Sequence, residues 1–424
     1  MSRGRTTRPS PFCLERFKET LVALDVPFES YFRLPQETMA GLIERVSPRL
    51  RQDTAQAHRT AGHAITPAHR VAIALRWMAG AQWQDILIAL QPVSRGEMYK
   101  SVWLVVDAIN CEYSGEWSYP TPPGGAPAAQ MTAAAQFWSK LEFRFREKSP
   151  QQCMEGVIGA IDGCILATCS PGFAVPNPKD YYCERKKMFG MLLMAASDAD
   201  MVIRFWDMRY SPKTHDSTAW KGCKLGAWLE AGHLPHPFCF LGDKAFRPGS
   251  ASLLTPGTTS GTTDVYKYVQ SRGRMPAEQC FGILLRTWGV LWRPLEVKFE
   301  RRAPLVSALI HLHNIRRTGG AALDVQGGHE LRHVGGKEQW GIKQRAKKNG
   351  AVQSTVVWHD APVIDADGRP TELLGLVNRG APGPAPRAPA GGSVRSVASR
   401  VTMLEGRIAE LGVTRPQPAA RRGR

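Results

Sequence analysis

An apolar run interrupted by one carboxylate is the feature of this sequence that most restricts its fold. The stretch GVIGAIDGCIL, residues 156–166, carries Val157, Ile158 and Ile161 at positions suited to burial, yet Asp162 stands among them. A buried carboxylate is costly unless another group pairs with it. We therefore expect a β-strand that ends on a functional acid.

The charge balance narrows the class of partner. The 424 residues are enough for two or three domains, and 55 lysines and arginines against 37 acids give a formal net charge of +18. Such an excess favours a polyanionic partner, most often nucleic acid. The alternative is a basic soluble protein without such a partner.

The spacing of the cysteines and the lengths of the apolar runs indicate the cellular compartment in which the protein is expected. The nine cysteines are dispersed from Cys13 to Cys280 without a CxxC pair, and Cys164 and Cys169 have no partner at zinc-like spacing. This pattern favours reduced thiols inside the cell. The start, MSRGRTTRPS, lacks the apolar core of a secretory signal, and no apolar run approaches the roughly 18 residues needed to cross a bilayer. We expect a soluble intracellular protein.

Residues 1–150 are predicted to be mainly helical. Within them, about 66–110 contain apolar stripes at helical spacing, and the break QPVS precedes a helix for which Ser94 is a plausible N-cap. Two helices joined by a tight turn suggest a helix-turn-helix, with Arg95 and Lys100 as candidate DNA contacts. Ordinary helix packing remains the alternative.

Residues 151–330 are predicted to form an α/β domain. Four stretches have the length and composition of strands, and three have helical periodicity. The strands are VIGAIDGCIL, MFGMLLMAAS, MVIRFWDMRY and PFCFLGD, and the helices lie near 216–231, 276–290 and 303–316.

Residues 331–424 are predicted to be a basic, Pro/Gly-rich and largely disordered tail. The stretch GAPGPAPRAPAGGS is low in complexity, and KQRAKK resembles a nuclear signal, a match that is frequent by chance. One short amphipathic helix is expected near 397–412.

Three further acids stand out by position. Asp243 ends the fourth predicted strand, and Asp216 precedes a helix in THDSTAW, where it also has the features of an N-cap. Glu278 lies off the apolar stripe of a helix that Pro276 would begin. The alternative for Glu278 is a glutamate favoured near a helix N-terminus by the macrodipole.

Carboxylates collected from distant elements repel one another and raise one another's pKa. Two Mg²⁺ or Mn²⁺ ions held roughly 3.5–4 Å apart remove that cost and can activate a water or a 3′-hydroxyl for attack on a phosphodiester. A pair of divalent ions would therefore explain why Asp162 is buried.

Six motifs in order resemble the DDE domain of PIF/Harbinger transposases and Harbinger-derived nucleases. They are GVIGAIDGCI, NPKDYYCERKKMFG, SPKTHDS, FLGDKAF, AEQCFGILLRTWGVL and LIHLHNI, over roughly residues 150–316. The helical segment before them resembles the region that precedes that domain. The resemblance implies an RNase H-like mixed sheet flanked by helices, and a separate Myb-like DNA-binding partner.

Carried over by position, the resemblance makes Asp162 and Asp243 the catalytic aspartates and Glu278 the glutamate. Asp216 would be an accessory acid of the metal site. There are departures: Met194 stands where the family usually has glutamine, and Lys244 and Phe246 where a small residue and tyrosine are commoner.

The cluster YYCERKKM adds a candidate DNA contact. Arg185, Lys186 and Lys187 are flanked by aromatic residues, a combination suited to phosphate contact and base stacking. The alternative is a solvated hairpin between strands.

The leading interpretation is a metal-dependent DNA endonuclease or transposase of the nucleus that cuts and joins DNA. A domesticated, non-catalytic DNA-binding protein is the second, and an RNA-directed nuclease of the same fold is a weaker third. The sequence leaves the oligomeric state open, a homo-oligomer included.

Overall fold

A computed structural model describes residues 12–50, 65–246, 252–256, 263–319, 329–334, 337–348, 351–360 and 394–414. The chain divides into two compact units, one of residues 1–318 with 392–424 and the other of residues 319–391. In the part of the chain just listed, no helix has the length and apolar character needed to cross a membrane.

The N-terminal region is helical, as predicted, and two of its helices begin at side-chain caps. The Thr66 hydroxyl accepts a hydrogen bond from the His69 N–H, and the Ser94 hydroxyl accepts one from the Glu97 N–H, so the predicted N-cap at Ser94 is confirmed. The helices are α1 (Leu14–Ala23), α2 (Phe28–Phe32), α3 (Gln36–Leu50), α5 (Pro67–Met78), α6 (Trp83–Ala89) and α7 (Arg95–Glu112).

Six strands form a mixed sheet in the order β2-β3-β1-β5-β6, with β4 paired to β3. The β1–β3 and β3–β4 pairs are antiparallel, whereas β5 and β6 run parallel to β1. The four predicted strands and the mixed α/β class, consistent with an RNase H-like domain, are confirmed. The strands are β1 (Val157–Ala167), β2 (Tyr182–Cys183), β3 (Met188–Ser197), β4 (Ile203–Tyr210), β5 (Cys239–Leu241) and β6 (Leu253–Leu254).

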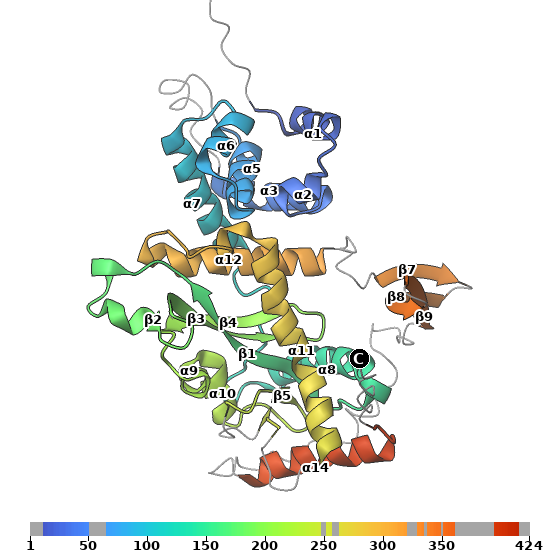
Figure 1. Cartoon of the computed structure of the whole chain (residues 1–424). Coiled ribbons are helices and arrows are strands. Elements are labelled where there is room, and N and C mark those ends of the chain that lie inside the picture. The colour runs from blue at the N-terminus through green and yellow to red at the C-terminus, as the bar shows by residue number, and fades with distance from the viewer. Residues whose placement is uncertain are drawn as a thin grey trace, which may run out of the picture. The chain divides into compact units, whose positions relative to one another are not determined.

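Both faces of the sheet are covered by helices (Figure 1). Alternate residues of β3 show this: Leu193 and Ala195 pack in the cluster that includes α11 (Asp264–Thr287) and α12 (Phe299–Thr318). Leu192 and Met194 pack on the opposite side. The helices there are α8 (Ala128–Lys148), α9 (Asp216–Gly222) and α10 (Lys224–Glu230). Strands buried on both faces are continuously apolar, as β3 is.

The single helix predicted near 216–231 is two helices. It breaks at Cys223, whose extended backbone ends α9 and whose sulfur accepts a hydrogen bond from the Gly226 N–H to start α10. The helix predicted near 303–316 is α12, which begins four residues earlier.

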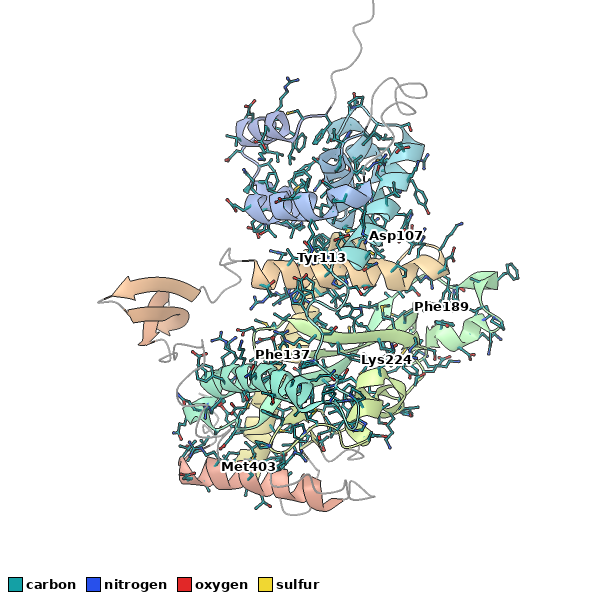
Figure 2. The ribbon with its side chains drawn as sticks, turned by 180° about the vertical axis from the view of Figure 1, so that it is seen from behind. Asp107, Tyr113, Phe137, Phe189, Lys224 and Met403 are labelled. Atoms are coloured by element: carbon teal, nitrogen blue, oxygen red, sulfur yellow. The ribbon has the colours of Figure 1, made fainter. Side chains whose placement is uncertain are left out.

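The N-terminal helices and the sheet region share one apolar core. Residues of α3, α5 and α7 lie in the same buried cluster as residues of α11 and α12. Across this contact Arg301 of α12 pairs with Asp107 of α7 at 3.0 Å, and the Asn110 side chain donates to the Pro304 carbonyl (Figure 2 labels Asp107). The sequence change near residue 150 is therefore not a division between compact units.

The region predicted to be a largely disordered tail contains regular structure. Strands β7 (His329–Val334), β8 (Lys337–Lys348) and β9 (Ala351–Asp360) form an antiparallel sheet in the second unit. The β-branched run QSTVVW in β9 favours a strand, whereas the prediction of disorder followed the basic composition of the neighbouring segment.

The last helix, α14 (Val394–Glu410), is part of the first unit. It corresponds to the helix expected near 397–412. Val401, Leu404 and Ile408 are buried in a cluster with residues of β1, β5, β6 and α11. The Arg400 guanidinium donates to the Phe238 carbonyl at 3.1 Å, and Glu405 accepts from the Thr263 N–H at 2.9 Å. Figure 2 labels Met403 on this helix.

Candidate active site

Asp162 lies inside β1, not at its end as predicted. The strand continues to Ala167 because its antiparallel ladder with β3 extends to the Ala167–Gly190 pair. The carboxylate is partly buried, and its Oδ1 accepts a hydrogen bond from the Gly163 N–H at 2.9 Å.

The register assigns Asp162 to one face of the sheet. Asp162 lies opposite Ala195, which packs with α11, whereas Gly163 lies opposite Met194, which packs with α9. Residues directly opposite on paired strands share a face. Asp162 therefore faces the α11 side, and position 163 faces the α9 side.

Asp243 follows β5 by two residues, close to its predicted place at a strand end. Its Oδ1 accepts a hydrogen bond from the Ala245 N–H at 2.8 Å, which holds the carboxylate in a turn. Because β5 runs parallel to β1, this turn lies at the edge of the sheet toward which both strands point.

Glu278 occupies the middle of α11, not the first turn of a helix. The helix begins twelve residues before Pro276, where the Thr263 hydroxyl caps it by accepting from the Tyr266 N–H. Pro276 is inside the helix, so the macrodipole does not account for Glu278. The side chain is 54% exposed and pairs with Arg274, one turn earlier, at 3.3 Å.

Asp216 is the first residue of α9, and His215 is the N-cap residue, without a side-chain hydrogen bond. The N-cap interpretation of Asp216 is therefore wrong. Its carboxylate instead lies against β1: a Cβ atom at Gly163 would be 2.7 Å from Asp216 Oδ1. The glycine leaves the space that this carboxylate fills.

Electrostatics connects the four acids through Asp162 and Asp243. Burial raises the pKa of Asp162 to about 6; the Gly163 N–H and Arg274 lower it, while Asp243 and Glu278 raise it further. Burial also raises the pKa of Asp216, with a further contribution from Asp243 and opposing ones from Arg185, His215 and Lys186. Asp162, Asp243 and Glu278 thus form one interacting set, and Asp216 joins it from the other face.

The donor chemistry suits Mg²⁺ or Mn²⁺, which prefer carboxylate oxygens. The spacing does not: among the residues with described positions, no three His, Cys, Asp or Glu side chains are grouped closely enough to hold an ion. The structure brings the acids into one neighbourhood without forming a metal centre.

The candidate DNA contacts are all exposed. Arg185, Lys186 and Lys187 lie in the turn between β2 and β3, and the charges of the first two reach Asp216. Arg95 and Lys100 are exposed on the first two turns of α7.

Comparison with known families gives one result. Residues 161–314 match the family model of the DDE superfamily endonuclease. The match begins just before Asp162 and ends on α12, so this DDE region contains all four acids. Neither a curated protein nor a solved structure matched the chain.

Two departures from the Harbinger pattern are core residues of the DDE region. Met194 is fully buried in β3, and Phe246 is buried with its ring edge-on to Trp220 at 6.3 Å between centroids. Lys244 is exposed. None of the three removes a carboxylate.

Two residues of the site were not predicted. Gly163 admits Asp216, and a glycine inside a strand is a known sign of close approach by another group. Arg274 pairs with Glu278, and its i, i+4 spacing on a helix was the available signal.

Proposed function

We propose that this chain is a metal-dependent DNA endonuclease or transposase of the Harbinger type, which cuts and joins DNA. One observation carries the proposal: within the DDE region, a carboxylate inside a buried strand has a raised pKa, and the two other acids that the family pattern requires act on it. A carboxylate kept in such surroundings is typical of a functional site.

Asp162, Asp243 and Glu278 are the proposed ligands of the divalent ions, and Asp216 is an accessory acid. Bound there, two such ions would supply an activated oxygen nucleophile and stabilise the leaving oxygen. The exposed cations Arg185, Lys186 and Lys187 would hold the phosphate backbone beside Asp216.

The first test is cleavage of DNA carrying the terminal repeats that flank the protein's own locus, with Mg²⁺ or Mn²⁺. We expect nicking by the wild type and its loss in Glu278→Gln, with DNA binding retained. Glu300→Gln, an exposed glutamate on α12, is the matched control and should cleave normally. Cleavage by Glu278→Gln at the wild-type rate would contradict the assignment.

The second candidate is a non-catalytic DNA-binding protein derived from a transposase. Two observations favour it: no three metal-binding side chains are grouped among the described residues, and Glu278 is already paired with Arg274. Binding of the same DNA without cleavage by the wild type would support this candidate. An RNA-directed nuclease is distinguished by comparing DNA and RNA duplexes as substrates.

The proposed setting is the nucleus, with a separate Myb-like DNA-binding partner, and a homo-oligomer is compatible with this activity. The proposal of a reducing compartment rests on the dispersed cysteine pattern of the sequence. Co-purification of the tagged chain from nuclear extract, followed by identification of a Myb-like protein, tests the partner.

A further inference from the structure

A guanidinium lies among the proposed metal ligands. Arg274 Nη2 is 3.3 Å from Glu278 Oε1, and the same charge acts on the Asp162 carboxyl. The Arg274 side chain is only 14% exposed, and its Nε is buried without a hydrogen-bond partner among the described residues. Arg274 therefore places a positive charge beside Glu278 and within electrostatic reach of Asp162.

The packing of α11 explains how Arg274 reaches this position. The preceding residue, Gly273, faces β5 so closely that a Cβ atom there would lie 2.4 Å from Leu241 Cδ1. The helix therefore presses against the strand that leads to Asp243. Arg274, the next residue of the helix, therefore lies near the acids. Arg272 is exposed and contacts the Met275 sulfur.

A cation in this place does what a divalent ion would do, since it offsets the repulsion among the carboxylates. The two cations would also repel each other and would share Glu278 as a partner. This accounts for the absence of a ready metal centre among the described residues, because Glu278 is engaged elsewhere.

We propose that Arg274 is a built-in counter-ion that competes with the divalent ion for Glu278, so that metal loading requires the Arg274–Glu278 pair to open. The inference rests on the proposed function, because it assumes that these acids bind the ion. Arg274 acts through Glu278 and is a positioning residue.

If Arg274 competes with the ion, its removal changes the metal affinity in the direction opposite to that expected from structural damage. Removing a positive charge that competes with the ion strengthens metal binding, whereas a variant that only loosens the site weakens it. The ion pair is partly exposed, so the effect on affinity is roughly two- to tenfold.

The experiment is Mn²⁺ titration of the full-length protein by calorimetry, without DNA. We expect Arg274→Gln to bind Mn²⁺ more tightly than the wild type, and Arg274→Lys, which keeps the charge, to bind close to the wild type. Arg272→Gln on the same helix is the matched control and should leave the affinity unchanged. Asp162→Asn should lose the binding, which locates it at these acids.

The failures are distinguishable. If the wild type binds Mn²⁺ and Asp162→Asn does not, but Arg274→Gln binds no more tightly, the competition is refuted and the proposed function stands. Equal tightening by Arg274→Lys also refutes it, because the charge is then not the cause. If the wild type and Asp162→Asn bind alike, or neither binds, the metal assignment fails and the competition fails with it. Thermal unfolding without metal verifies that each variant is folded.

Discussion

Asp216 Oδ1 fills the space into which a side chain at Gly163 would project, 2.7 Å from the position of its Cβ. This places an acid from α9 directly on the strand that carries Asp162, through a gap that only glycine leaves. Asp162 and Asp216 thus lie on opposite faces of β1, and Asp243 is the acid whose charge reaches both.

Gly163→Ala should displace Asp216 from β1. We expect a loss of stability of about 1–3 kcal/mol from overpacking, together with a loss of metal-dependent cleavage. Denaturant unfolding and the nicking assay measure the two effects. Gly282→Ala is the control, since its Cβ would meet nothing nearer than Arg286 Nη2 at 3.8 Å. Unaltered cleavage by a folded Gly163→Ala protein would remove Asp216 from the site.

Asp162→Asn should stabilise the metal-free protein at neutral pH. The folded-state pKa of Asp162, about 6, is above its ordinary value of 3.8, so the group favours folding at low pH. That contribution is lost as the pH rises from about 4 through 6, and by pH 7 the ionised carboxylate costs at most about 3 kcal/mol.

The measurement is the free energy of unfolding against pH in the presence of EDTA. The difference between Asp162→Asn and the wild type should grow from pH 4 to pH 7 in favour of the variant. Asp180→Asn, an exposed aspartate of the DDE region, should show no such growth. A wild type that is more stable than Asp162→Asn at pH 7 would mean that the carboxylate is not strained by burial.

Arg95→Ala and Lys100→Ala should weaken DNA binding if α7 contacts the phosphate backbone. Each lost contact lowers the slope of log K against log salt by roughly 1, because fewer counterions are released. Binding titrations at several salt concentrations measure this slope. Lys140→Ala, an exposed lysine on α8, is the matched control. An unchanged slope in both α7 variants would move DNA recognition elsewhere.

Leu404→Ala should destabilise the first unit by about 2–5 kcal/mol, because Leu404 is 1% exposed in the cluster that α14 shares with β1, β5 and α11. Denaturant unfolding of the full chain is the measurement. Thr402→Ala on the exposed side of the same helix should change stability little. Equal stability of the two variants would mean that α14 does not contribute to the core.

Hydrophobic periodicity is sufficient to predict an element whose apolar residues form a continuous pattern and are buried. Strand β3 was predictable because its alternate residues are buried on two faces, and α12 because its stripe is continuous. Asp162 interrupts an apolar run and Asp243 follows one, whereas Asp216 and Glu278 are indicated by their places at a helix start and off an apolar helix stripe. Their approximate grouping followed from the order of the strands and from the family resemblance.

Tertiary packing decided what periodicity could not. The first half of α11 is polar and contains Gly273, and Pro276 follows it, so the sequence predicts a helix that begins at the proline. Burial of Tyr266 and Val269 stabilises the earlier turns. The glycine inside β1 and the i, i+4 spacing of Arg274 and Glu278 are visible in the sequence, but the group that fills the space at Gly163 is set by the contact between α9 and β1.

The docking of α14 has a consequence for how the protein is made. Helix α14 supplies buried side chains to the same unit as residues 1–318, while residues 319–391 form a separate unit between them. During synthesis on the ribosome, the growing chain exposes the apolar surface beside β5 and β6 until Ile408 has emerged. The first unit would therefore complete its folding late, after the intervening unit has already been translated.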